Sequence, residues 1–216
     1  ILLPLGYTYS DFTILSNINK QSAEIAQQVE RTNKKLGAGD IGVAFGYATN
    51  ETKDLLPLPY ILATKFIYKI NELTKKGTLK FTNYDSKAQV TVRYENGKPV
   101  GIETVIVSLQ HFKQANIKAL RDQIKKTILD PIAKEYKMKT DFVFELNKNG
   151  TFISGGPFAD TGVTGRKLMV DTYGSLGRHG GGAFSGKDYT KVDRTGAYYA
   201  RYIAKNLVKA GVADKI

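Results

Sequence analysis

Apolar positions recur at two different spacings along the chain, and these spacings predict its helices and strands. Between residues 57 and 74 they recur every three or four positions, behind two prolines that suit a helix start. Residues 88–94 instead alternate apolar with polar side chains, which is typical of a half-buried strand. The "ENGK" stretch at 95–98 predicts a tight hairpin turn, so residues 101–109 are expected to form the partner strand.

The second half of the chain continues this mixture of helices and hairpins. Residues 116–130 predict an amphipathic helix that ends at Pro131. We expect a second hairpin over 142–156, a short strand over 168–174, and a helix with one apolar face over 193–209. Because hairpins and helices follow one another without strict strand–helix–strand alternation, the predicted fold class is α+β.

The composition narrows the classes of partner. Lys and Arg exceed Asp and Glu by 32 to 20, and the net charge of +12 attracts polyanions without choosing among nucleic acid, polyphosphate and acidic membrane. No apolar run approaches the length of a membrane span. The sequence also lacks the usual nucleic-acid signatures. We therefore expect neither a membrane nor a nucleic-acid partner, although a basic nucleic-acid-binding domain stays a distant alternative.

The reactive residue types exclude several kinds of site. Cysteine is absent, which rules out disulfides and thiolate metal sites and suits a cytoplasmic protein. The two histidines, His111 and His179, have no partner at metal-site or catalytic-triad spacing. No G-x-S-x-G motif occurs, so hydrolase chemistry of these kinds is disfavoured.

The stretch "RHGGGAFSGKDYTKVDR" at 178–194 contains most of a phosphate-binding P-loop. From Gly181 it runs G-x-x-x-x-G-K, but Asp188 stands where the motif needs Ser or Thr. A P-loop follows a buried strand and opens a helix at its lysine, whereas here the helical pattern begins only near Asp193. We therefore reject the P-loop.

The same stretch still suits an anion site. Its glycines allow backbone N–H groups to approach a ligand, and Lys187 and Lys191 add positive charge. Asp193, at the start of the final helix, is expected either to cap it or to hold a magnesium ion. Two further segments combine acidic and basic side chains in this way: Asp85 with Lys87, and Asp160 with Arg166 and Lys167. Three such clusters favour a ligand with several phosphates; the alternative is glycine turns with surface ion pairs.

Four segments resemble, in the same order, the S-adenosylmethionine synthetase family. They are "GAGDIGVAFGY" (37–47), "GGPFADTGVTGRKLMVDTYG" (155–174), "GGGAFSGKD" (180–188) and "KVDRTGAYYARYIAKNLV" (191–208). The resemblance implies three similar α+β units around a pseudo-threefold axis. It also implies an enzyme that joins methionine to ATP, displaces the whole tripolyphosphate and hydrolyses it to pyrophosphate and phosphate. Mg2+ and K+ are the implied cofactors, and a dimer or dimer of dimers with active sites between subunits is the implied assembly.

The resemblance also implies roles for individual residues. Lys87, Arg166 and Lys187 match catalytic residues, Asp193 matches a magnesium-associated aspartate, and Phe152 matches the aromatic residue against the adenine. The implied ATP-binding residues are Asp85, Lys87, Thr151, Phe152, Asp160, Arg166, Lys167, Ala183 and Lys187. The implied methionine-binding residues are Gln21, Asp40, Asp160 and Lys191. This set is chemically coherent, because a thioether sulfur carries no proton and catalysis must come from positioning and from stabilising charge on the leaving group.

On the same resemblance, residues 1–36 would be the tail of the first unit, with a mobile gating loop at about 21–31. Residues 37–155 would be the central unit and 156–216 the start of the third. The family's H-P-D-K segment, its potassium-site glutamate and its C-terminal portion are missing from this sequence. We therefore expect a piece of a longer enzyme; the alternative is a truncated, non-catalytic relative that binds nucleotide or a partner subunit. Three residues depart from the family pattern: Ile41 for Gln, Thr151 for a basic residue and Tyr189 for Pro.

Overall fold

The computed structural model describes residues 2–30 and 36–216. Residue 31, the last residue of the expected gating loop, lies outside the described residues. Among the described residues, no helix is both long and apolar enough to cross a membrane.

The chain forms two compact units, each assembled from segments that are distant in sequence. The first unit contains Ile1–Thr13 and Leu58–Thr161, and the second contains Ile14–Pro57 and Gly162–Ile216. Each unit has its own cluster of buried side chains.

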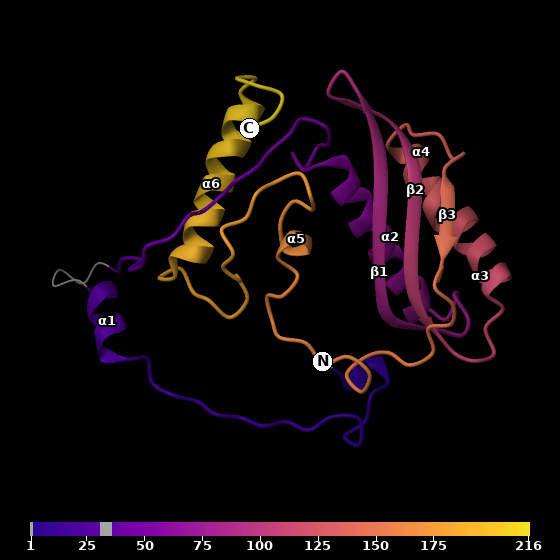
Figure 1. Ribbon diagram of the computed structural model, residues 1–216, viewed down its shortest axis with the longest axis horizontal. Coiled ribbons are helices and arrows are strands. Elements are labelled where there is room, and N and C mark those ends of the chain that lie inside the picture. Colours follow the sequence, from indigo (N-terminus) through magenta and orange to yellow (C-terminus); the bar gives the residue numbers. More distant parts are fainter. Residues whose placement is uncertain (1, 31–35) are drawn as a thin grey trace. The chain divides into compact units, whose positions relative to one another are not determined.

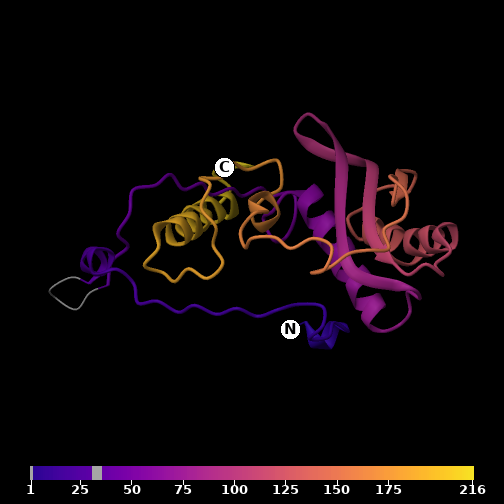
Figure 2. The ribbon, with the colours of Figure 1, turned by 60° about the horizontal axis from the view of Figure 1, so that its bottom comes forward.

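The first unit is built on a three-stranded sheet in the order β1-β2-β3. Strands β1 (Thr82–Glu95) and β2 (Lys98–His111) form the long antiparallel hairpin seen in Figures 1 and 2. Asn96 and Gly97 turn the chain with φ values of 50° and 76°, the left-handed geometry that an Asn-Gly hairpin turn requires. This hairpin confirms the prediction from alternation and turn chemistry.

Helix α2 (Leu58–Lys75) contributes one row of buried side chains to this unit's core, and its bounds confirm the predicted helix. Its fully buried Leu62, Phe66 and Ile70 recur at helical spacing, and they pack in one cluster with the buried side chains of β2. Burying large apolar side chains of this kind contributes about 1.5–3 kcal/mol each. The core therefore holds β2 firmly in place, including the end of the strand at His111.

The predicted helix over 116–130 was wrong at its C-terminal end. Helix α3 (Ile117–Ile124) begins as expected, with the Asn116 side chain accepting a hydrogen bond from the Ala119 N–H at 3.0 Å. It then continues as the π-helical segment η2 (Lys125–Leu129) and as α4 (Asp130–Glu135). Proline is tolerated here because it falls in the first turn of α4, directly after the wider π turn.

The two remaining strand predictions were also wrong. The second hairpin does not form: β3 (Val143–Leu146) pairs in parallel with β2, and the residues after the turn at 147–150 lie beside the end of β2. The expected strand at 168–174 is instead a single helical turn, α5 (Leu168–Asp171). Short apolar runs fit either structure, so local pattern alone does not separate them.

The second unit contains α1 (Ala23–Val29), α5 and α6 (Val192–Lys209), and α6 confirms the predicted final helix. Its buried cluster is small and consists of Ala48, Ala204 and Val208. The segment that contains Gly46 packs directly on α6, because a side chain on Gly46 would collide with the main chain of the helix at Ala200.

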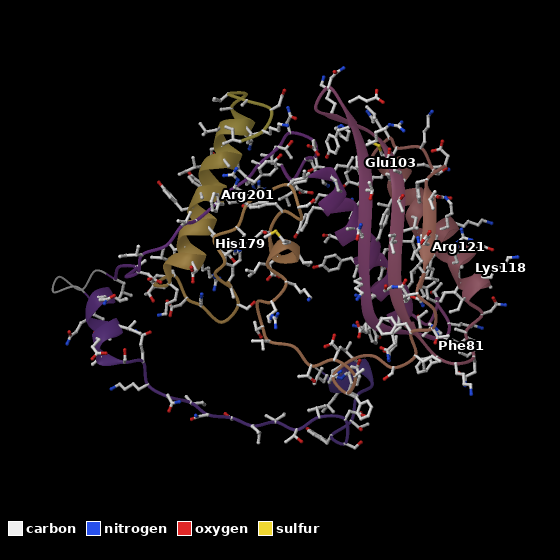
Figure 3. The ribbon with its side chains drawn as sticks, viewed as in Figure 1. Phe81, Glu103, Lys118, Arg121, His179 and Arg201 are labelled. Atoms are coloured by element: carbon white, nitrogen blue, oxygen red, sulfur yellow. The ribbon has the colours of Figure 1, made fainter. Side chains whose placement is uncertain are left out.

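Arg201 of α6 ties the helix to the preceding segment of the second unit (Figure 3). Its guanidinium donates to the main-chain oxygens of Tyr47 and Leu55, both at 2.7 Å, and to that of Asp54 at 2.8 Å. Three carbonyl acceptors suit the planar array of N–H donors on arginine. Burial of the guanidinium lowers the pKa of Arg201 from its ordinary value. The remaining short helix, η1 (Leu3–Leu5), belongs to the first unit.

Candidate functional site

In the first unit, the candidate residues gather where a glycine turn meets the hairpin. Asp85 of β1 is half-buried, and its Oδ2 accepts a hydrogen bond from the Gly156 N–H at 2.9 Å. The Asp160 N–H in turn donates to the Gly156 carbonyl at 3.0 Å. The structure thus connects two predicted acidic residues through one turn. Lys87 lies two positions beyond Asp85 on β1 and is exposed.

The glycines of this turn are required by close packing. A Cβ atom on Gly155 would lie 2.7 Å from Cδ of Gln110 and 3.1 Å from Oδ2 of Asp85. Gly156 has φ +75°, and a side chain there would collide with the ring of Tyr7. Burial and, next, the negative charge of Asp85 raise the pKa of Tyr7 above its ordinary value. Sequence reasoning missed Tyr7, because nothing in the pattern near residue 7 connects it with residue 156.

Phe152, the expected partner of the adenine, is half-buried, and its neighbour Thr151 is exposed. The main-chain N–H of His111 donates to the Phe152 carbonyl at 2.9 Å, and the Gln110 side chain donates to the Ile153 carbonyl at 3.1 Å. Sequence reasoning did not propose Gln110 or His111 as site residues. The sequence signal that could have identified them is two adjacent polar residues at the end of a predicted apolar strand.

In the second unit, Lys187 and Asp193 form an ion pair with Nζ and Oδ2 separated by 2.5 Å. The Arg194 guanidinium donates to the main-chain oxygen of Lys187, and Gly182 packs directly against the Asp193 carboxylate. Asp193 lies in the first turn of α6, where the helix dipole favours a negative charge. It does not cap the helix, because the N-cap position is Lys191 and no side-chain cap bond forms there.

Asp188 closes a local turn beside this ion pair. Its Oδ1 accepts hydrogen bonds from the hydroxyl and the main-chain N–H of Thr190, at 2.5 and 2.7 Å. These two bonds lower the pKa of Asp188, chiefly the one from the hydroxyl. The aspartate that departs from the P-loop motif therefore shapes the turn between the two lysines.

Lys191 lies beside Gln21, which is 170 positions away in the sequence. The ammonium donates to Oε1 of Gln21 at 2.9 Å and to the Thr190 hydroxyl at 3.1 Å. Two predicted methionine-binding residues are thus brought together. The third in this unit, Asp40, accepts a hydrogen bond from the N–H of the adjacent Ile41 at 2.7 Å, which is a local contact.

The basic pair Arg166 and Lys167 is exposed and directly precedes α5. The preceding Gly165 has φ +78° and touches Cβ of Ala183, so a side chain on Gly165 would collide with it. The structure therefore places the "GRK" loop against the glycine-rich stretch that carries Lys187.

His179 has a local role in the same stretch (Figure 3). Its Nδ1 accepts a hydrogen bond from the Gly181 N–H at 2.8 Å, and its ring lies 5.4 Å from that of Phe184, centroid to centroid. Over residues 2–30 and 36–216, no three His, Cys, Asp or Glu side chains gather as a metal site. Asp193, the residue expected to associate with magnesium, therefore offers a cation one carboxylate, without two further acidic or histidine side chains beside it among these residues.

A groove of about 600 Å³ runs beside α6 in the second unit. It is lined by Asp188, Tyr189, Arg194, Thr195, Tyr198, Tyr199 and Tyr202. Tyr189, which stands where proline was expected, therefore contributes an exposed aromatic ring to a surface already rich in tyrosine.

Comparison with known proteins agrees with the motifs. The model of the S-adenosylmethionine synthetase central domain matches residues 35–152, and that of the C-terminal domain matches 153–216. The chain is 49% identical over 216 residues to S-adenosylmethionine synthase of Mycoplasmopsis pulmonis, covering all of this chain and 57% of the relative. It is 51% identical over 223 residues to that of Mycoplasma mycoides subsp. mycoides SC, covering all of this chain and 58% of the relative. The S-adenosylmethionine synthase of Wolinella succinogenes is 49% identical over 210 residues, or 97% of this chain and 54% of the relative.

Proposed function

Because this chain belongs to the S-adenosylmethionine synthetase family, we propose that the full-length gene product makes S-adenosylmethionine from ATP and L-methionine. The methionine sulfur attacks C5′ of the ribose and displaces tripolyphosphate, which is then hydrolysed to pyrophosphate and phosphate. Relatives at 49–51% identity named S-adenosylmethionine synthase support this activity. The chain spans 57% of the length of the first of them, so the proposal concerns the whole protein.

The observation that carries the proposal is the Lys187 cluster. The sulfur nucleophile has no proton to lose, so the reaction needs no general base, whereas the departing tripolyphosphate accumulates negative charge. Lys187 is held at 2.5 Å from Asp193 in a glycine-rich stretch, with the loop of Arg166 and Lys167 packed against that stretch through Gly165. Such a group of cations beside a glycine-rich main chain suits a polyphosphate.

We assign the remaining ATP contacts by family motif. Lys87, Arg166 and Lys187 are the catalytic cations, and Lys167 adds a further phosphate contact. Phe152 stacks on the adenine, with Thr151, Asp85, Asp160 and Ala183 completing the nucleotide contacts. The hydrogen bond between Asp85 and Gly156 at 2.9 Å supports this assignment, because it fixes a carboxylate beside the segment that follows Phe152.

Methionine is assigned to Lys191, Gln21, Asp40 and Asp160. The 2.9 Å bond between Lys191 and Gln21 supports the first pair, since an ammonium and an amide can together bind an amino acid's polar groups. Gln21 begins the proposed gating segment at about 21–31, within which α1 spans Ala23–Val29.

Mg2+ and K+ are the proposed cofactors. Mg2+ is commonly held by one or two protein carboxylates together with substrate phosphates, so the single carboxylate of Asp193 fits this role. When bound, the cation neutralises charge on the triphosphate.

We further propose the family's assembly: a dimer or dimer of dimers with active sites at the subunit interface, in the cytoplasm. Each subunit would consist of three similar units around a pseudo-threefold axis. In this chain, residues 1–36 would end the first unit, 37–155 would form the central one and 156–216 would begin the third.

The experiment is an assay of the purified full-length gene product with ATP, methionine, Mg2+ and K+, after its mass has been measured. We expect S-adenosylmethionine, identified by chromatography and mass spectrometry, with one pyrophosphate and one phosphate per product. A protein that binds ATP without forming this product would instead be a non-catalytic relative. Tight, salt-dependent binding to DNA or RNA without turnover would support a nucleic-acid-binding function.

A further inference from the structure

His111 is the last residue of β2, and only 3% of its surface is exposed. Both ring nitrogens have main-chain partners: Nδ1 lies 3.0 Å from the Phe112 carbonyl oxygen, and Nε2 lies 3.1 Å from the Phe152 nitrogen. A carbonyl only accepts hydrogen bonds, and a main-chain N–H only donates them. The ring proton is therefore assigned to Nδ1, which leaves Nε2 bare to accept from Phe152.

The same residue also binds the other polar group of Phe152. The main-chain N–H of His111 donates to the Phe152 carbonyl at 2.9 Å, so one residue engages both the N–H and the C=O of Phe152. Gln110 extends the attachment by donating to the Ile153 carbonyl at 3.1 Å. Because β2 is held by the hydrophobic core, these bonds fix the backbone from which the Phe152 ring projects.

We propose that His111 is a positioning residue for nucleotide recognition. Its unprotonated Nε2 holds the Phe152 N–H and thereby sets the aromatic ring against the adenine. The inference rests on the proposed function, in which Phe152 stacks on that base. It gives a task to a histidine that has no side-chain partner at catalytic spacing.

Asn147, directly after β3, provides a matched control in the same unit. It too is buried, and it too engages both main-chain groups of one residue: Oδ1 accepts from the Leu109 N–H at 2.8 Å, and Nδ2 donates to the Leu109 carbonyl at 3.0 Å. Its partner is a core residue rather than the proposed adenine contact. Removing the Asn147 side chain therefore tests how the loss of two buried side-chain-to-main-chain hydrogen bonds affects ligand binding when the adenine contact is not involved.

The two conservative replacements of His111 separate the two ring nitrogens. In His111→Asn the amide nitrogen can replace Nδ1 toward Phe112, but nothing replaces Nε2. In His111→Gln the longer side chain brings its amide oxygen to the place of Nε2, so the bond to Phe152 can re-form. A purely structural role would make the two variants similar in nucleotide binding.

The experiment compares ATP with tripolyphosphate, which lacks the base, as ligands of the full-length gene product. By calorimetry we expect His111→Asn to weaken ATP binding about tenfold, the loss of roughly one hydrogen bond. Tripolyphosphate affinity stays within about twofold, since the phosphates do not contact the adenine side. His111→Gln recovers most of the ATP affinity, and Asn147→Ala lowers the melting temperature without changing the ratio of the two affinities.

Equal weakening of both ligands by His111→Asn, or no weakening of either, would overturn the inference. In the wild-type protein, ¹⁵N NMR of the ring should show a bare Nε2, and a protonated Nε2 would overturn the inference even where a variant fails to fold. Absence of S-adenosylmethionine formation alongside the expected contrast between ATP and tripolyphosphate would reject the proposed reaction but retain the role of His111. Formation of S-adenosylmethionine without the contrast between ATP and tripolyphosphate would retain the proposed reaction but reject the role of His111.

Discussion

The two compact units differ in what holds their candidate residues in place. In the first, Val105 and Val107 of β2 lie in one buried cluster with Phe66 of α2, and none of these three side chains has exposed surface. In the second, the buried cluster consists of three small side chains. There the chain is held mainly by polar contacts such as those of Arg201 and by close main-chain approach at glycines.

This difference matches the work proposed for each unit. An aromatic ring that stacks on a base must be held in a fixed position. The buried strand β2 provides this, because it is hydrogen-bonded to the main chain of Phe152. Lysines that bind a departing polyphosphate must exchange partners. Lys187 and Lys191 already contact oxygen atoms of Asp193 and Gln21, which ligand oxygens can replace or join. Four predictions test this contrast.

The largest effect is expected from removing the centre of the first unit's core. Phe66→Ala should lower the free energy of unfolding by about 3–5 kcal/mol, because a large buried ring is lost and a cavity is left. Tyr68→Ala on the same helix should change it by less than about 0.5 kcal/mol, since that side chain is 74% exposed. Urea unfolding of the two full-length variants gives the comparison. Equal losses would mean that the core does not dominate this unit.

The next effect concerns catalysis in the second unit. Lys187→Ala should lower kcat by roughly 10²-fold or more, as expected for a group that stabilises charge on the leaving group. Lys205→Ala, on the exposed surface of α6, should retain wild-type kcat. S-adenosylmethionine formation at saturating ATP and methionine measures both. Near-normal turnover of Lys187→Ala would remove that residue from its assigned role.

A smaller effect tests the close approach of the chain to α6. Gly46→Ala should cost about 1–3 kcal/mol, because the new methyl group meets main-chain atoms of Ala200 and Arg201 that cannot move aside. Gly162→Ala in the same unit should be nearly neutral, since nothing lies within 4 Å of the added carbon and φ is not positive. Thermal unfolding distinguishes them, and a Gly46→Ala protein as stable as Gly162→Ala would contradict the packing argument.

The smallest effect concerns a surface ion-pair network in the first unit. Hydrogen bonds from Lys69 and Lys76 to Glu72, at 2.8 and 2.5 Å, lower the pKa of that carboxyl from 4.5 to about 2. A lowered pKa contributes stability that is fully present above 4.5 and is lost as the pH falls toward 2. Glu72→Gln should therefore lower the melting temperature slightly at pH 7, and this deficit should shrink below pH 4.5. Because the carboxylate is exposed, added salt should also reduce the deficit, and a deficit independent of pH and salt would contradict this account.

Local sequence signals predicted the elements that depend on local physics. The Asn-Gly turn and the helical periodicity of α2 and α6 gave the hairpin and both long helices. The parallel pairing of β3 with β2 joins segments about 39 residues apart in sequence, such as Thr104 and Val143, and no local pattern specifies it. The same reason explains why Pro131 did not end the helix: its tolerance depends on the preceding π turn.

The candidate site was predictable to the extent that charge and glycine mark it. Lys187, Asp193 and the Asp85 region stood out as residue types. The pairing of Lys191 with Gln21 across 170 positions did not, because it requires the folded chain. The sequence did not indicate a role for His111, because no side chain lies at catalytic or metal-site spacing from it. Its ring nitrogens contact main-chain groups instead, and such contacts have no sequence motif.

The most direct test of the proposed reaction is a single turnover of the full-length gene product, quenched in acid, with ATP labelled in the phosphates. Our account predicts that S-adenosylmethionine and intact tripolyphosphate appear together, before pyrophosphate and phosphate. Release of ADP or AMP, or pyrophosphate appearing without tripolyphosphate ahead of it, would contradict the claim that the lysines of the second unit stabilise a triphosphate that departs whole.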